Sequence, residues 1–558
     1  MSRFFAKIEL MKNKLILLFI LFLAAFLRFY NLENLPINAH TDEITNTYVG
    51  RFIWQNAVDL YGNKWPILYF DKFGDYPNVI PMYLSGLTTY VFGFNKLAMR
   101  FPIALFGVLA VYLIYLLGKA IFKSEKMALF SAFTLAIFPW HIVLSRATAE
   151  GVTAMAVFAL GFYLLIQGIE KNRVLLLISS FLILLGTYLF YASYRILIPL
   201  FLLPTFLLAS QRKTKTLLII FAIISIILTG LISQTNWGKG RFKQTSIFSP
   251  TSLVYPMQGE FLAEEGQSNV LKSKIFFNKP LMFTREFIKQ YLKYFSPEFL
   301  FSMGGLPKRY QVPEQGLWYY SYLLLFISLI ILGKKTINLE KSKNKYLIFL
   351  LYLLAIIPIP GALTIDDAPN LHRTALMAFT LSLLASIPFI TLQNLKWKKI
   401  NFNWLLFLMM GLETIYFWNK YAMHADKYNE LDRNKGYDNL AKFLLDKKDQ
   451  YQQIFVERNG EIAIYYLFYS HNFDKNLSKQ FGFDLRLEKV DNISFTDYEC
   501  VYPGNYPDSK QFKDSLFIFS TSCNERLNKY FSLHPEFKKV EEIHSSSGSE
   551  MFEVYLLN

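Results

Sequence analysis

Apolar runs about as long as a membrane span recur between residues 15 and 418, separated by short polar breaks. A hydrocarbon core about 30 Å thick requires about 20 apolar residues in each crossing helix. The predicted helices cover residues 14–30, 101–122, 127–144, 151–169, 174–190, 195–210, 216–233, 317–333, 346–358, 374–393 and 403–419. The pattern therefore predicts a polytopic α-helical membrane protein with about eleven transmembrane helices.

The apolar periodicity changes at about residue 421, so we expect a membrane domain over residues 1–420 and a soluble domain over residues 421–558. The soluble part combines an amphipathic helical pattern at 437–445 and a helical pattern at 462–469 with short apolar runs at 454–456 and 516–519. Alternation of this kind predicts a small α/β domain.

The formal net charge of +16 comes from Lys and Arg residues gathered in short loops, so it indicates membrane orientation and not a nucleic-acid partner. Basic residues before the first helix place the N-terminus in the cytoplasm. If residues 79–94 lie along the outer surface as an interfacial helix, all later basic clusters fall inside. The first loop (31–100), the long loop (234–316) and the C-terminal domain are then outside an integral plasma-membrane protein.

Asp42 and Glu43 are adjacent acids directly after the first apolar helix. Such a pair can bind a cation, act as a general base, or lie in water. The same loop holds His40, Lys72 and Tyr76, so proton acceptors and a phosphate-binding cation are close in sequence. These neighbouring residues favour a chemical role for the acidic pair.

Further candidate residues lie at the predicted outer ends of helices. His141 and Arg146 follow Pro139-Trp140, and Arg195 ends the stretch that begins at Tyr191. Either these are boundary residues with snorkelling cations, or they hold an anionic ligand at the membrane surface.

A Pro-rich outer loop ends in His372 and Arg373, where an arginine fork could hold a phosphate. The alternative is one more boundary arginine. No Walker loop, dinucleotide fingerprint, CxxC or HExxH motif occurs in the sequence. The two cysteines, Cys500 and Cys523, are either paired or free.

Taken in order, these stretches resemble the GT-C membrane glycosyltransferases, in particular the bacterial protein mannosyltransferase and aminoarabinose-transferase-like group. The matching pieces are Asp42-Glu43, residues 100–107, 139–146 with Glu150, 191–195, 294–300 and 371–373. The resemblance covers about residues 10–420. It implies transfer of a sugar, such as the hexose mannose, from a polyprenyl-phosphate carrier to a protein, lipid or glycan acceptor outside the cytoplasm, with inversion at the anomeric carbon.

Carried onto this sequence, the resemblance makes Asp42 the first-loop acid and general base, with Glu43 beside it. Arg373 and His372 fall on the leaving-phosphate side. The aminoarabinose-transferase branch has a Lys before a Pro in this loop, but here Tyr76 precedes Pro77, so Lys72 is the nearest cation. That departure puts an aminoarabinose donor in doubt.

General-base catalysis supplies about 10²- to 10⁴-fold, and fixed cations such as Arg373, Lys72 and Arg195 would stabilise a leaving phosphate without an acid. No cofactor is required, and a divalent metal held by His40, Asp42 and Glu43 is optional. Two other classes of function remain open. One is a transporter or flippase of a lipid-linked sugar, and the other is a sensor in which the soluble domain does the work.

Overall fold

The computed structural model describes residues 2–70, 76–248, 259, 275–276, 278–336, 341–393, 396–397, 400–428, 431–434, 436–457, 460–481, 487–496, 513–545 and 547–557. The chain forms two compact units, each assembled from segments distant in sequence. The helical unit comprises Met1–Asn31 and Ile103–Ala425, and the mixed unit comprises Leu32–Pro102 and Asp426–Asn558. The structure thus groups most of the first loop with the C-terminal segment, whereas the sequence placed that loop in the membrane domain.

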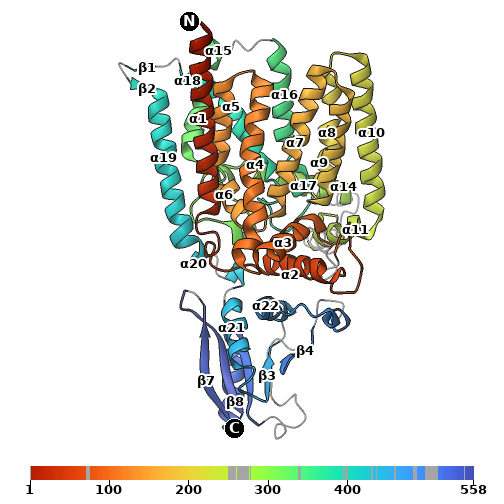
Figure 1. The fold of residues 1–558 in the computed structure, drawn as a ribbon, viewed down its shortest axis with the longest axis vertical. Coiled ribbons are helices and arrows are strands. Elements are labelled where there is room, and N and C mark those ends of the chain that lie inside the picture. The colour runs from red at the N-terminus through yellow and green to blue at the C-terminus, as the bar shows by residue number, and fades with distance from the viewer. Residues whose placement is uncertain are drawn as a thin grey trace. The chain divides into compact units, whose positions relative to one another are not determined.

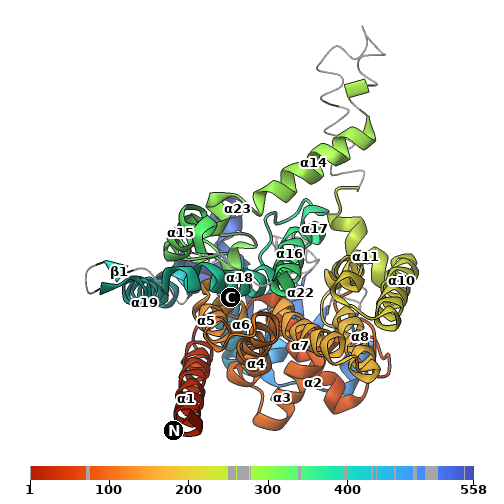
Figure 2. The same ribbon diagram turned by 90° about the horizontal axis from the view of Figure 1, so that it is seen from above.

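Helices of the helical unit run side by side as a bundle (Figure 1), which Figure 2 shows along the helix axes. They are α1 (Ser2–Phe29), α4 (Lys96–Phe122), α5 (Glu125–Ile137), α6 (Pro139–Arg146), α7 (Glu150–Lys171), α8 (Val174–Gly186), α9 (Tyr194–Leu202), α10 (Arg212–Gln234), α15 (Tyr320–Thr336), α16 (Lys341–Ile356), α18 (Leu376–Gln393) and α19 (Phe402–Lys420). Most apolar runs of the sequence thus form helices, although α9 ends at Leu202, before the predicted end at residue 210.

Further elements connect these helices. They are the helices α11 (Asn236–Thr245), α14 (Lys279–Lys293) and α17 (Ile359–Ala362), the 3₁₀ turns η1 (Thr187–Leu189), η2 (Thr205–Leu208) and η5 (Lys308–Tyr310), the π turns η4 (Glu298–Ser302) and η6 (Tyr421–Ala425), and the hairpin β1 (Lys396–Trp397) with β2 (Ile400–Asn401).

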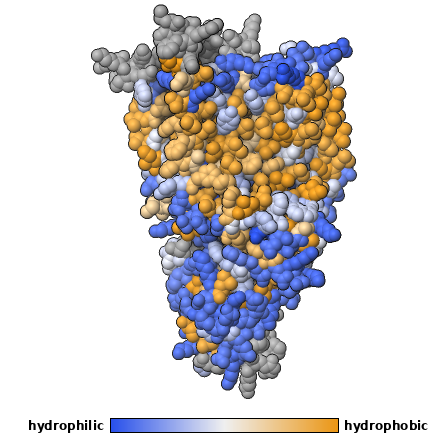
Figure 3. Space-filling view, in the orientation of Figure 1, coloured by the Kyte–Doolittle hydropathy of each residue, from blue (hydrophilic) through white to orange (hydrophobic). Residues whose placement is uncertain are grey.

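By length and composition, five helices in the described part of the chain suit a membrane crossing. They are Ile8–Phe29, Lys96–Phe122, Glu150–Lys171, Arg212–Gln234 and Lys345–Ala362. Apolar side chains cover much of the visible face of the bundle (Figure 3). The protein is an integral membrane protein, whereas the total of about eleven spans stays a prediction.

The predicted helix over residues 127–144 is wrong as one continuous element. The structure breaks it at Phe138, between α5 and α6, and the two pieces are bent by 56°. Pro139 explains the break, because proline lacks the N–H of a helical hydrogen bond and disfavours the α region for the residue before it.

The mixed unit contains a six-stranded sheet in the order β4-β5-β3-β6-β8-β7, in which β5, β3 and β6 are parallel. Its strands are β3 (Gln453–Val456), β4 (Lys489–Val490), β5 (Ile493–Phe495), β6 (Ser515–Ser520), β7 (Phe537–His544) and β8 (Glu550–Leu557). Its helices and turns are α2 (Thr41–Asn56), α3 (Val79–Phe92), α20 (Asp426–Tyr428), η7 (Leu431–Arg433), α21 (Tyr437–Lys447), α22 (Gly460–Ser470), η8 (Lys475–Lys479), η11 (Thr521–Cys523) and α23 (Asn524–Leu533).

Alternating side chains of the sheet serve two cores. Ile454 and Val456 of β3 face a core shared with α21 and α22, whereas Phe455 belongs to a second core with Leu527 of α23. The first core also contains the buried side chains of α2 and α3. The first loop and the C-terminal segment therefore fold around common apolar packing, with a helix on the other face of the sheet.

Helices α2 and α3 cross at two glycines. A Cβ atom on Gly50 would lie 2.1 Å from the carbonyl oxygen of Met82, and one on Gly86 would lie 2.2 Å from the carbonyl carbon of Gly50. Only glycine allows the two backbones to approach this closely. The crossing fixes α2, which carries the acidic pair, against α3.

Candidate active site

The acidic pair opens helix α2. Asp42 and Glu43 lie in its first turn, where negative charge is favoured by the helix dipole. The side chain of His40 caps the helix, since its Nδ1 accepts a hydrogen bond of 3.0 Å from the amide of Asp42. The local sequence thus determines where the helix starts and orients both acids.

The two carboxylates lie in different environments. The side chain of Asp42 is 46% exposed, and its Oδ2 is 3.4 Å from His40 Nδ1. The side chain of Glu43 is 3% exposed, and its Oε2 accepts a hydrogen bond of 3.1 Å from Arg100 Nε. Of the pair, Asp42 is the acid that solvent can reach.

Arg100 holds Glu43 inside a buried network. Its Nη1 donates to the carbonyl oxygens of Leu32 at 3.0 Å and Pro36 at 2.8 Å, so its charge is shared with the loop before α2. Arg433 Nη1 approaches Glu43 Oε1 to 3.9 Å from the other side. Glu43 is therefore a buried carboxylate with an arginine on either side.

The remaining first-loop candidates are Tyr76 and Lys72. Tyr76 packs edge-on against Tyr69, with ring centroids 5.0 Å apart. Lys72 lies outside the described residues. Within the described ranges, no group of three or more His, Cys, Asp or Glu side chains is arranged to hold a metal ion. Glu43 is directed to Arg100, so the three suggested ligands do not form such a group.

In the helical unit, Arg373 is held by the loop that precedes it. Its Nη2 donates to Asp366 Oδ2 at 2.9 Å and its Nη1 to Asp366 Oδ1 at 3.2 Å. Nη1 also donates to Thr364 Oγ1 and to the carbonyl oxygen of Asp366. The guanidinium thus forms a bidentate ion pair with the Asp366 carboxylate, whose side chain is 41% exposed. The same two N–H groups could bind another anion.

His372 lies in an aromatic and backbone cradle. Its Nε2 accepts a hydrogen bond of 2.7 Å from the amide of Gly151, the second residue of α7. Its ring stacks on Tyr191 at a centroid distance of 4.4 Å. A backbone amide can only donate, so Nε2 carries no proton and Nδ1 is the donor of the neutral ring.

Tyr294 supports the same loop. Its hydroxyl accepts a hydrogen bond of 2.9 Å from the amide of Asn370, and Asn370 Oδ1 accepts one of 2.8 Å from the amide of Arg373. Burial raises the pKa of the Tyr294 phenol to about 12, with smaller opposing effects from Asn370 and Arg373. Tyr294 therefore stays protonated at neutral pH and acts as a fixed support.

Arg195 is buried against Trp237. Its guanidinium carbon lies 3.8 Å from the centre of the Trp237 ring, and its Nη1 donates to the Trp237 carbonyl oxygen at 2.9 Å. This contact is a close cation–π arrangement. It connects the start of α9 to the start of α11.

His141 and Arg146 lie inside the bundle and contact helix ends. Arg146 donates to the carbonyl oxygens of Leu27 at 3.0 Å and Tyr30 at 2.7 Å, which are free at the C-terminal end of α1. His141 Nδ1 lies 2.6 Å from Arg28 Nη2, and Arg28 also donates to carbonyl oxygens at the end of α5. Both side chains thus brace the junction of α1, α5 and α6.

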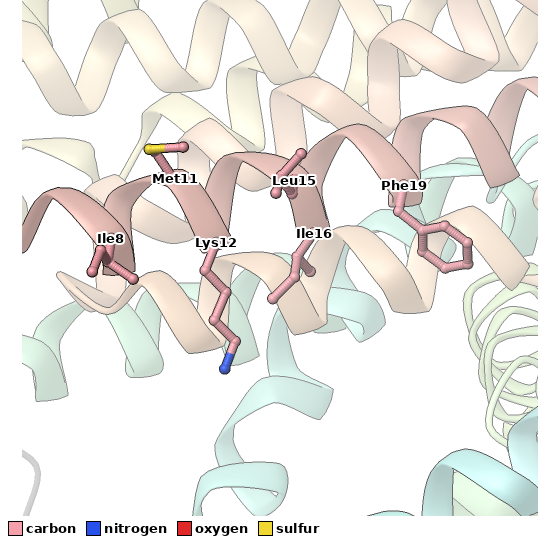
Figure 4. A pocket seen from close by; sticks show the side chains of 6 residues that line it. All are labelled: Ile8, Met11, Lys12, Leu15, Ile16 and Phe19. Atoms are coloured by element: carbon pink, nitrogen blue, oxygen red, sulfur yellow. The ribbon is translucent and has the colours of Figure 1, made fainter. Parts of the chain in front are cut away.

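A pocket lies on the side of α1 (Figure 4). It is lined by Ile8, Met11, Lys12, Leu15, Ile16 and Phe19. All six belong to one apolar helix, and none is a candidate catalytic residue. The pocket is therefore a feature of the surface of this apolar helix.

Several contributors to these clusters had no distinct sequence signal. Asp366 stands in an acidic pair with Asp367, which was visible in the sequence, but its bond to Arg373 requires the fold. Gly151 acts through its backbone amide, and Asn370 acts through its side-chain oxygen. No sequence motif marks either residue. The pairing of Glu43 with Arg100 joins residues 57 positions apart.

With these clusters described, the chain can be compared with known proteins. Residues 75–237 match the family model described as dolichyl-phosphate-mannose-protein mannosyltransferase. No curated protein matches the chain in sequence. The family match includes α3, α4 and α7, and thus the helix that presents Gly151 to His372.

Solved structures with similar folds cover nearly the whole chain. ArnT from Cupriavidus metallidurans bound to undecaprenyl phosphate matches with a TM-score of 0.51 and 10% identity, over 98% of this chain and 97% of that one. Its apo state gives a TM-score of 0.52 and 10% identity over 98% of both chains. AglB from Archaeoglobus fulgidus, in complex with an inhibitory peptide and a dolichol-phosphate, gives 0.47 and 14% identity over 98% of this chain and 74% of that one.

These similarities confirm the resemblance to the GT-C glycosyltransferases and to their protein mannosyltransferase and ArnT-like group. The fold of this chain, with its helical bundle and a C-terminal segment containing a sheet, is similar to that of ArnT over nearly the whole length of both chains.

Proposed function

We propose that the protein is a glycosyltransferase that moves a sugar from a polyprenyl-phosphate carrier to an acceptor outside the cytoplasm. The observation that carries this proposal is the difference in environment between Asp42 and Glu43. Glu43 is neutralised by Arg100, whereas Asp42 presents a half-exposed carboxylate from the start of a rigid helix. The family match and the undecaprenyl phosphate bound to ArnT support the class of donor.

In this proposal the protein crosses the membrane about eleven times, with its N-terminus in the cytoplasm. The first loop, the long loop and the C-terminal segment are then outside. The exposed apolar side chains of α3, including Val91 and Phe92, suit a helix lying at the membrane surface. A lipid-linked donor fits an active site on this side, where cytosolic nucleotide sugars are absent.

Asp42 is the proposed general base. It takes the proton of an acceptor hydroxyl while the hydroxyl oxygen forms a bond to the anomeric carbon of the sugar. The bond from that carbon to the phosphate oxygen breaks, and its electron pair stays with the polyprenyl phosphate. Attack from the face opposite the leaving group inverts the anomeric centre. The reaction as written needs no cofactor or metal ion.

The leaving phosphate gains negative charge, which fixed cations stabilise. We propose that Arg373 binds it by exchanging the carboxylate of Asp366 for two phosphate oxygens, because both are planar, bidentate acceptors. His372 offers its Nδ1–H as a further donor. Lys72 and Arg195 complete the proposed set of donor-phosphate residues.

The donor sugar is proposed to be a hexose such as mannose, in line with the description of the matching family. Tyr76 stands where the aminoarabinose-transferase branch has a lysine, which argues for a donor without the amino sugar. The acceptor is a protein, a lipid or a glycan.

A direct test is to reconstitute the purified protein with a panel of radiolabelled polyprenyl-phosphate sugars and a membrane extract as acceptor source. We expect one sugar to leave its lipid and appear in protein, lipid or glycan. A protein that moves the labelled lipid across the vesicle membrane and never cleaves it would instead be a flippase, and the proposal would fail.

A further inference from the structure

The segment that leads into Asp42 is held from both sides by the C-terminal part of the chain. Residues 38–43 belong to the first loop, yet five of their side-chain or backbone groups contact residues beyond 430 within the mixed unit. These contacts join residues about 400 positions apart, so local sequence alone does not produce them.

The start of helix α2 is capped by the C-terminal segment. The amide of Thr41, the first helical residue, donates to Asn434 Oδ1 at 2.9 Å, while His40 accepts from the amide of Asp42. The first N–H groups of a helix have no partner within the helix, so these two side chains supply what the helix lacks. One cap comes from the loop and the other from a residue almost 400 positions later.

Glu461 secures the same residue by its side chain. The hydroxyl of Thr41 donates to Glu461 Oε2 at 3.1 Å, and Asn434 Nδ2 donates to that oxygen at 3.2 Å. Thr41, Asn434 and Glu461 are therefore joined pairwise by hydrogen bonds, one of them from the backbone amide of Thr41, directly before Asp42. Glu461 lies in the first turn of α22, which packs against α2 in the shared core.

The residues before the helix are held in the same way. The hydroxyl of Tyr465, one turn further along α22, donates to the carbonyl oxygen of Ala39. Arg433 donates to the carbonyl oxygen of Asn38 at 3.3 Å and approaches Glu43. Ala39 is fully buried, and Asn38 is nearly so, which leaves this backbone little freedom.

We propose that the C-terminal segment is a positioning element of the transferase, in which Asn434, Glu461 and Tyr465 hold the backbone around Asp42 so that its carboxylate reaches the acceptor hydroxyl. The inference rests on the proposed function of Asp42. Displacement of a catalytic group by about 1 Å can cost about 10²-fold in rate. The C-terminal segment thus acts on turnover without touching the substrate.

Two adjacent tyrosines of α22 provide a matched test. Tyr465→Phe removes the hydrogen bond to Ala39, whereas Tyr466→Phe removes one to Asp491 Oδ2, at 2.6 Å, elsewhere in the C-terminal segment. In the full-length protein in membranes, Tyr465→Phe is expected to lower kcat for transfer by about 10-fold or more, with KM for the lipid donor within about twofold. Tyr466→Phe is expected to retain wild-type kcat. Equal kcat for the two variants, or a fall in both, would overturn the proposal.

A second pair keeps the test valid if Tyr465→Phe does not fold. Thr41→Val removes the hydroxyl that donates to Glu461 with little change in shape, and Thr41→Ser retains it. We expect kcat to fall in Thr41→Val and to be restored in Thr41→Ser. Loss in both, or in neither, contradicts a positioning role.

Asp42→Asn, assayed alongside, distinguishes a failure of the base assignment from a failure of the positioning proposal. If Asp42→Asn retains wild-type transfer, the base assignment fails, and the positioning proposal falls with it. If Asp42→Asn is inactive while Tyr465→Phe and Thr41→Val are fully active, the base assignment stands and the positioning proposal alone is overturned.

Discussion

Glu43 and Arg100 form a buried ion pair in which Arg100 Nε donates to Glu43 Oε2 at 3.1 Å, while the adjacent Asp42 remains half-exposed. The two acids thus differ in burial, since the side chain of Glu43 is 3% exposed and that of Asp42 is 46% exposed. The pairing supports the proposal that Glu43 stabilises the first loop and that Asp42 is the catalytic base.

This difference predicts that two substitutions affect the stability of the protein unequally. Glu43→Ala leaves Arg100 as an uncompensated buried charge, which costs about 3–5 kcal/mol of folding free energy. A lower thermal midpoint of the purified protein, measured by intrinsic fluorescence in detergent, would report that loss. Asp42→Asn should leave the midpoint within about 1 °C, since surface substitutions usually change stability by less than about 0.5 kcal/mol. Equal midpoints for Glu43→Ala and Asp42→Asn would contradict the division of roles.

Arg373 is expected to govern donor affinity. Hydrogen bonds to charged groups contribute about 1.5–3 kcal/mol, so Arg373→Gln should raise KM for the lipid-linked donor by about 10- to 100-fold. Initial rates against donor concentration measure this effect. Lys289→Gln, which removes an exposed cation paired with Glu286, serves as the control and should behave as wild type. An unchanged KM in Arg373→Gln would remove Arg373 from the phosphate site.

Gly151 is expected to be intolerant of even one methyl group. A Cβ at this position would lie 2.7 Å from both Cδ2 and the carbonyl oxygen of His372, so Gly151→Ala must displace that residue. We predict a loss of transfer of about 10-fold or more, by the same sensitivity to about 1 Å of misplacement. Gly230→Ala is the matched control, because nothing lies within 4 Å of its added Cβ. Full activity of Gly151→Ala would show that the geometry around His372 is unimportant.

Tyr294 should contribute no ionisation to the pH profile. Burial raises the pKa of its phenol to about 12, above the ordinary value, so the neutral form persists below that pH. Tyr294→Phe should reduce kcat/KM, since the amide of Asn370 loses its acceptor. The shape of kcat/KM against pH between about 6 and 10 should match wild type. A basic limb that disappears in Tyr294→Phe would identify the phenol as a titrating catalytic group.

The apolar runs predicted most of the helical unit because a helix that crosses a bilayer must satisfy its own backbone and present apolar side chains. Residues 151–169 were predicted and α7 spans Glu150–Lys171. Helix α2 was missed, although its signal was present. Asp42 and Glu43 suit a first helical turn, and Ile44, Tyr48 and Phe52 follow at helical spacing.

Other features depend on contacts that sequence position does not encode. The resemblance predicted roles for Asp42 and for the pair His372-Arg373, and these stay predictions. The partner of Glu43 lies 57 residues away, and the cap of Thr41 lies 393 residues away, so neither could be predicted from the sequence. Composition separated residues 421–558 as a soluble domain, whereas the apolar faces of α2 and α3 join them in one core. The sequence did not decide whether Cys500 and Cys523 are paired. Cys523 is disulfide-bonded, and Cys500 lies outside the described residues.

The rate of a single turnover in Asp42→Asn tests the central claim most directly. Enzyme in excess over a radiolabelled polyprenyl-phosphate sugar isolates the chemical step from donor binding and product release. The account predicts a fall of about 10²- to 10⁴-fold relative to wild type, with donor binding retained. Transfer by Asp42→Asn at the wild-type rate would contradict it.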